Sequence, residues 1–111
     1  MMAIRVQTEP GPSYERPALR FLSDLVGGLG PEGNRFLILD RIPGDDPDVY
    51  FQVWHDGEGG YQVEHRAGSP KLHFQTHVGV ADEVVELMML WARREEDCDR
   101  GFRWERLDLP G

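Results

Sequence analysis

Four histidines, His55, His65, His73 and His77, come nearest to a metal site by their type and spacing. Imidazole is a common zinc ligand, and the four-residue spacing of His73 and His77 would place both on one face of a helix. The surrounding residues alternate between apolar and polar as in a strand, however, and at about 3.3 Å per residue the two imidazoles would lie about 13 Å apart. His55 and His65 would point to the opposite side. We therefore predict no metal site.

The segment GLGPEG, residues 28–33, has the letters of the dinucleotide-binding motif G-x-G-x-x-G. That motif works when a strand precedes the glycines and a helix follows them, because the helix N-terminus then receives the pyrophosphate. Here the helical pattern comes first and the strand pattern second, Pro31 lacks an amide hydrogen, and Glu32 would repel phosphate. We interpret the segment as a helix C-cap and turn, and we predict no cofactor.

Nucleophilic catalysis has equally little support in the sequence. Ser13, Ser23 and Ser69 lack the strand, turn and helix of a nucleophile elbow. Cys98 lies in the acidic segment EEDCD, which disfavours the reactive thiolate. We predict that the protein is not an enzyme.

The charge balance narrows the class of partner. The chain has 111 residues, which fits a single domain with an ordinary core. Twenty acidic and twelve basic residues give a formal charge of -8, which repels phosphate backbones and favours basic partners. The opening segment MMAIRVQTEP has no apolar run and Cys98 is the single cysteine, so we expect a cytoplasmic protein without a disulfide, signal peptide or membrane span. Nucleic acid and membrane are not expected partners.

The spacing of apolar residues predicts one α+β domain over residues 1–111. Residues 1–16 are interpreted as a short edge strand followed by an extended connector. Helical spacing predicts two helices, mainly on one face of a sheet, over residues 18–27 and 81–97. Four alternating runs with short, turn-rich connections predict a four-stranded antiparallel meander: residues 35–42, 49–56, 61–67 and 72–78. The tail segment FRWERLDL alternates again and predicts a C-terminal strand.

The register of the meander decides which side chains face the helices. If DGEGG is a five-residue connection, the core parity of the second run is that of Phe51 and Val53; a four-residue connection would bury Tyr50 and Trp54 instead. We prefer the first choice, because it buries no polar tip that needs a partner. Extending this register back places Ile42 near Val49. The predicted core face then carries Phe36, Ile38, Phe51, Val53, Val63 and Phe74.

The outward face has a composition typical of protein interfaces, with aromatic anchors beside a hydrogen-bonding rim. In this register Leu37, Leu39 and Arg41 also turn outward. The predicted partner-binding residues are Tyr50, Trp54, Glu64, Arg66, His73, Gln75 and His77. The alternative is that the tail, with Phe102 and Trp104, or the helices cover this side and make it a second core.

The stretch QVWHDGEGGYQVEHRAGSPKLHFQT, the helix containing LWARREE and the tail containing FRWE resemble small bacterial immunity proteins encoded with polymorphic toxins. The resemblance spans about residues 35–105 and carries over no catalytic or binding residue. It implies an α+β inhibitor that neutralises a toxin domain in the producing cell. An acidic domain with an aromatic face suits a basic toxin domain. The alternative function is a self-associating or regulatory interaction domain without catalysis, with a homodimer as its complex.

Overall fold

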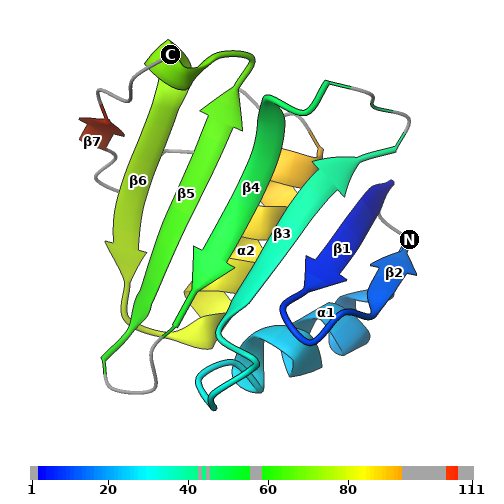
Figure 1. The fold of residues 1–111 in the computed structure, drawn as a ribbon. Helices are drawn as coiled ribbons and strands as arrows, with labels where there is room; N and C mark the ends of the chain where they lie inside the picture. Colours follow the sequence, from blue (N-terminus) through cyan, green and yellow to red (C-terminus); the bar gives the residue numbers. More distant parts are fainter. Residues whose placement is uncertain (1–2, 43, 45, 56–58, 94–104, 108–111) are drawn as a thin grey trace.

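The computed structural model is a seven-stranded antiparallel sheet with two helices on one of its faces (Figure 1). The structure describes residues 3–42, 44, 46–55, 59–93 and 105–107. The strands are β1 Ile4–Thr8, β2 Ser13–Glu15, β3 Phe36–Arg41, β4 Val49–Trp54, β5 Tyr61–Ala67, β6 His73–Val78 and β7 Glu105–Leu107. The helices are α1 Leu19–Gly27 and α2 Ala81–Ala92, and a 3-10 turn, η1, spans Pro70–Leu72. The predicted α+β class and antiparallel sheet are confirmed.

The sheet has more strands than the four predicted, because its spatial order is β2-β1-β3-β4-β5-β6-β7. The predicted meander, β3 to β6, forms its centre. The segment interpreted as an extended connector instead turns back and adds β2 to β1. Gly11 makes this turn possible with a left-handed φ of 123°, and its N–H donates to the carbonyl of Thr8 at 3.2 Å. The predicted edge strand β1 is therefore an inner strand.

The register of β4, β5 and β6 agrees with the prediction. Trp54 pairs with Gln62, which sets His55 opposite Tyr61 and leaves residues 56–60 as a five-residue connection between β4 and β5. Phe51 and Val53 face the helices and are buried, with 1% and 0% of their surfaces exposed. Phe74 also takes the helix side in the cross-strand register but is only half-buried.

The predicted register of β3 is wrong by one residue. Leu39 pairs with Phe51, which leaves one residue more in the β3–β4 connection than expected. A shift of one residue moves every side chain of a strand to the other face. Leu37 and Leu39 are therefore fully buried against the helices, whereas Phe36 and Ile38 face away from them and are half-buried.

The β3–β4 connection ends in a turn at Asp46. The carbonyl oxygen of Asp46 accepts the Val49 N–H at 3.1 Å, and its Oδ1 accepts the Asp48 N–H at 2.9 Å. Short Asp side chains commonly hold turns in this way. The apolar residues of β3 alone suit either face, so the length of the connection decides which of them are buried.

Arg41, predicted to point outward, also lies on the helix side. Its Nε and one terminal nitrogen donate to the carbonyl oxygen of Trp91 at 3.3 and 2.7 Å, and its guanidinium carbon lies 4.2 Å from the centre of the Trp91 ring. A cation at the C-terminal end of a helix interacts favourably with the helix dipole and with unpaired carbonyl groups. Arg41 thus fastens the end of α2 to β3.

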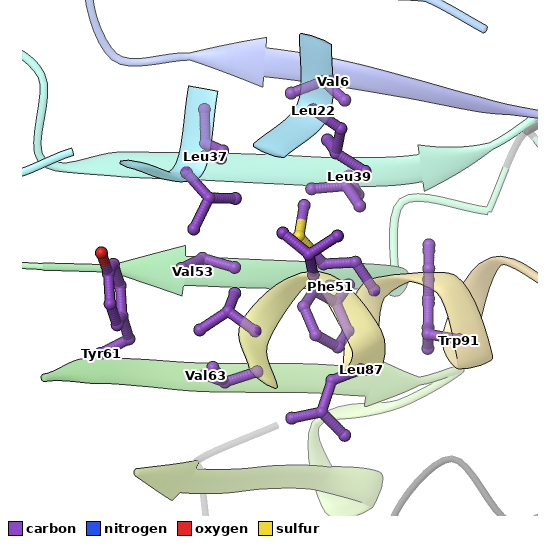
Figure 2. Packing of buried hydrophobic residues seen from close by; sticks show 14 of the residues in the cluster. Val6, Leu22, Leu37, Leu39, Phe51, Val53, Tyr61, Val63, Leu87 and Trp91 are labelled. Carbon is purple, nitrogen blue, oxygen red and sulfur yellow. The ribbon is translucent and has the colours of Figure 1, made fainter. Parts of the chain in front are cut away.

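The core lies between the sheet and the two helices (Figure 2). Leu22 and Val26 of α1 and Leu87 and Trp91 of α2 pack on the buried side chains of the strands. Trp91 meets Phe51 with ring centres 5.6 Å apart. The described part of α2 ends at Ala92, and positions 94–97 of the predicted helix lie outside the described residues. Neither described helix is long and apolar enough to cross a membrane.

Candidate interaction face

We define the open face as the side of the sheet turned away from α1 and α2, on which no helix of the described residues lies (Figure 1). Every second side chain of β1 to β6 belongs to it by cross-strand register. Its members are Arg5, Gln7, Ser13, Glu15, Phe36, Ile38, Asp40, Tyr50, Gln52, Trp54, Gln62, Glu64, Arg66, His73, Gln75 and His77. All seven residues predicted to bind a partner are among them, and their role in binding stays a prediction.

The apolar part of the open face lies on β3 and β4. Phe36 is directly opposite Trp54, and Ile38 follows on the same face; all three are half-buried. Phe36 and Ile38 take the places that the predicted register gave to Leu37 and Leu39. The face therefore has the aromatic and aliphatic side chains expected of it, but two of them are different residues.

The polar part of the open face contains a hydrogen-bonded chain across β5 and β6. Arg66 donates from a terminal nitrogen to Asp48 Oδ1 at 2.9 Å and from Nε to His73 Nδ1 at 3.2 Å. The other ring nitrogen, His73 Nε2, lies 3.0 Å from Glu64 Oε1. A guanidinium can only donate, so Nδ1 of His73 must accept and Nε2 carries the hydrogen that is donated to Glu64. In this arrangement His73 has one ring hydrogen, on Nε2, and its imidazole is neutral.

The four histidines divide between the two faces of the sheet. His73 and His77 lie on the open face, whereas His55 and His65 have the helix-side parity. His73 is 4% exposed and both of its ring nitrogens have partners, and the His55 ring packs on Tyr61 with ring centres 4.4 Å apart. Among the described residues no three metal-ligating side chains come together. His55, His65 and His73 thus pack on aromatic rings or form hydrogen bonds, whereas His77 is exposed.

Tyr50 joins the apolar and polar parts of the open face. Burial raises the pKa of its phenol above the usual 10.0; the Arg66 charge opposes this rise, and the charges of Glu64 and Asp48 add to it. Its ring meets the His73 ring edge-on at 5.9 Å, and the Arg66 guanidinium lies 5.3 Å from its centre. Tyr50 is therefore a fixed aromatic ring whose neutral hydroxyl can donate a hydrogen bond.

A cavity of about 510 Å³ lies on the open face beside the β3–β4 connection. Its walls combine carboxylate, amide, phenol and apolar groups, and the lining residues are Gln7, Ile38, Asp40, Gly44, Asp46, Pro47, Val49, Tyr50 and Gln52. Of these, only Tyr50 was predicted as a binding residue. The register error had turned Ile38 and Asp40 toward the core, and no sequence signal showed that β1 would lie beside β3 and bring Gln7 to the same cavity.

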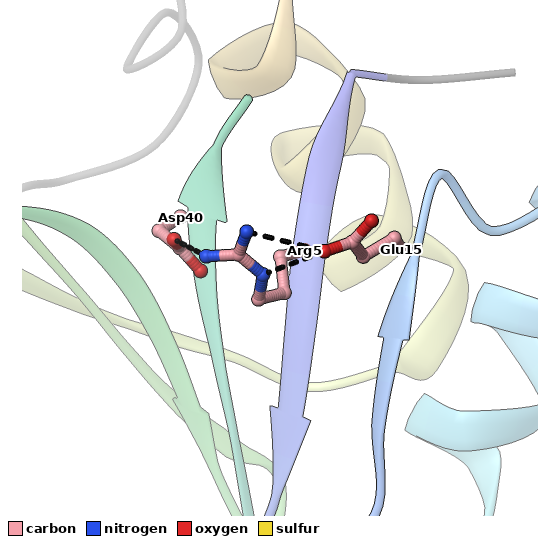
Figure 3. Close-up of polar contacts among 3 residues, drawn as sticks. All are labelled: Arg5, Glu15 and Asp40. Carbon is pink, nitrogen blue, oxygen red and sulfur yellow. Dashed lines mark hydrogen bonds and ion pairs between the residues drawn. The ribbon is translucent and has the colours of Figure 1, made fainter. Parts of the chain in front are cut away.

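Asp40, which lines the cavity, belongs to an ion-paired group on β1, β2 and β3 (Figure 3). Arg5 reaches Glu15 Oε1 through two nitrogens at 3.2 and 3.3 Å, and a third nitrogen reaches Asp40 Oδ2 at 3.0 Å. Asp40 Oδ1 is buried and has no hydrogen-bond partner within the described part of the chain. Leaving such an acceptor unpaired costs about 1 to 3 kcal/mol.

The GLGPEG segment is a helix end and turn, as interpreted from its sequence. The Gly28 N–H donates to the carbonyl oxygen of Asp24 at 3.0 Å and closes α1, and the Asn34 side chain donates to the Gly28 carbonyl at 3.0 Å. No helix N-terminus follows the glycines, because β3 comes next. The geometry that would receive a pyrophosphate is therefore missing from this segment.

The structure does not describe three residues that were considered from the sequence: Cys98, Phe102 and Trp104. Comparison with protein-family models, with curated proteins and with solved structures gives no match, so the likeness to immunity proteins stays a prediction.

Proposed function

We propose that this chain is a protein-binding module, an immunity-type inhibitor that neutralises a toxin domain through its open face and has no catalytic role. The observation that carries the proposal is the composition of that face. Phe36, Ile38 and Trp54 form an apolar strip that no helix of the described residues covers, and the hydrogen-bonded chain through Arg66 and His73 borders it. Aromatic anchors inside a polar rim are the usual anatomy of a protein interface.

The charge of the open face favours a basic partner. Its two guanidinium groups, on Arg5 and Arg66, are both held in ion pairs. The carboxylates of the face and of the adjoining β3–β4 turn outnumber them, in line with the net charge of -8. A basic protein would gain complementary charge and faster association. Two copies of this face would instead bring like charges together, which disfavours the homodimer.

Trp54 is the residue best placed to separate binding from stability. It lies on the open face between Phe36 and Gln62 and is only half-buried. We expect Trp54→Ala to lower the free energy of unfolding by less than about 1.5 kcal/mol. The same change should weaken the partner complex by about 2 kcal/mol, roughly thirtyfold in Kd.

The experiment compares thermal melts with calorimetric affinity for the basic protein that co-purifies with the tagged chain from its host. Phe21→Ala is the matched control, because Phe21 is an aromatic on α1, on the other side of the sheet, with 39% of its surface exposed. The control should leave affinity unchanged. Unfolding by Trp54→Ala with unaltered affinity per folded molecule would make the open face a second core. A dimer in sedimentation that Trp54→Ala dissociates would replace the inhibitor by a self-associating domain.

A further inference from the structure

We infer that the cavity beside the β3–β4 connection is a socket for a basic side chain, arginine or lysine, of the protein partner. This inference rests on the proposed function and specifies which group of the partner enters the open face. Three features carry it: the two carboxylates in the lining of the cavity, its apolar walls, and Asp40 Oδ1, which is buried and has no hydrogen-bond partner among the described residues.

The lining of the cavity has a net negative charge, because the Arg5 guanidinium that pairs with Asp40 also pairs with Glu15. Arg5 divides its nitrogens between Glu15 and Asp40, so the three groups together keep one negative charge. Asp46 adds a second carboxylate to the lining, and its Oδ1 accepts the backbone N–H of Asp48. Among the residues that the structure describes, no lysine or arginine lines the cavity. A cation from outside would meet the carboxylates of Asp40 and Asp46, and the Arg5 guanidinium beside Asp40 is shared with Glu15.

The walls suit the two ends of a basic side chain differently. Ile38, Pro47 and Val49 offer apolar surface to a methylene stem, while the amides of Gln7 and Gln52 offer oxygens to a guanidinium or ammonium group. Hydrogen bonds to a charged donor are stronger than neutral ones. At about 510 Å³ the cavity is within the size range of binding sites for small groups.

The position of the cavity also fits an interface. Tyr50 lines it and at the same time belongs to the polar chain through Arg66 and His73. A basic side chain in the cavity would therefore lie at the border of the apolar strip on β3 and β4. There it would fix the register of the partner, which is the part that charged groups usually play at interfaces.

The test uses three blocked peptides, acetyl-Gly-X-Gly amides in which X is arginine, lysine or citrulline. Amide chemical shifts of the isotope-labelled full chain are followed during titration. We expect the arginine and lysine peptides to shift amides around Asp40, Asp46 and Gln52, and the uncharged citrulline peptide to bind about tenfold more weakly or worse. Comparing arginine with lysine then distinguishes a forked donor from a point charge.

Variants of the chain keep the test independent of the peptide series. Asp40→Asn and Asp46→Asn should each weaken the arginine peptide about tenfold, whereas Asp24→Asn on the exposed surface of α1 is the control of equal charge change. Gln7→Lys places a cation at the cavity from an exposed strand position and should block the peptide. Equal binding of citrulline, shifts outside the cavity, or an unchanged affinity in both Asn variants would overturn the inference.

Failure of the socket and failure of the proposed function give different results. If Trp54→Ala weakens the partner complex while Asp40→Asn and Asp46→Asn leave its affinity and salt dependence unchanged, the open face binds but the socket is wrong. If the arginine peptide binds in the cavity while Trp54→Ala leaves the partner complex intact, the socket stands and the proposed interface is wrong.

Discussion

Exchanging two neighbouring side chains of β3 for alanine, one on each face, tests the register on which the open face depends. Leu39 is fully buried against the helices, whereas Ile38 is half-buried on the open face. Both changes remove three carbon atoms. For Leu39→Ala the lost transfer free energy is about 2.4 kcal/mol at about 0.8 kcal/mol per methylene. A closed cavity adds to this, and the total becomes about 3 to 5 kcal/mol.

Ile38→Ala should cost much less, about 1 kcal/mol, because roughly half of the side chain is already in contact with water and no closed cavity remains. Urea unfolding measures both losses. With a slope of about 1.5 kcal/mol per molar, the midpoint should fall by about 2 to 3 M for Leu39→Ala and by less than about 1 M for Ile38→Ala. Reversed shifts would place Ile38 in the core and Leu39 outside, and equal shifts would show that both are buried to the same degree; either result would contradict the register of β3.

Three further outcomes follow from the same structure. Phe51→Ala, at a side chain 1% exposed, should lower the free energy of unfolding by about 3 to 5 kcal/mol, whereas Gln75→Ala on the open face should change it by less than about 0.5 kcal/mol; similar denaturant midpoints for the two variants would contradict the burial pattern. The pKa of the Tyr50 phenol should lie above 10.0 when the protein is titrated with alkali and the absorbance is compared with that of Tyr50→Phe. Because folding favours the neutral phenol, its contribution to stability is complete below pH 10.0 and is lost as the pH rises through the raised pKa. Ionisation below pH 10.0 would show that the phenol is not desolvated. Calorimetry with zinc, NAD or ATP should detect no binding tighter than about 100 μM, and stoichiometric zinc uptake that His73→Ala abolishes would reverse the metal prediction.

Local sequence patterns were sufficient for the centre of the sheet. The DGEGG connection has one length that buries Phe51 and Val53 without burying a polar tip, and the alternation of β5 and β6 extends that choice. The outward position of Tyr50, Trp54 and Arg66 followed from it. These predictions held because turn length and side-chain polarity pointed to the same register.

At the β3–β4 connection, turn length and side-chain polarity did not indicate one register, and the predicted register of β3 was wrong. Phe36 and Ile38 are as apolar as Leu37 and Leu39, so β3 alone suits either face, and the length of the connection to β4 decides between them. The cavity was missed for a second reason. Gln7 lines the cavity because β1 pairs with β3. These strands are far apart in the sequence, and local spacing of residues does not predict such a pairing.

The short strands at the two ends of the sheet bear on how the protein behaves when it is concentrated. β2 and β7 have three residues each, and their exposed carboxylates, Glu15 and Glu105, lie at these ends. A sheet edge with few free backbone groups and with charged side chains is a poor template for strand addition by another molecule. We therefore expect this domain to resist edge-to-edge aggregation and domain swapping even though the apolar strip of its open face is uncovered by any described helix.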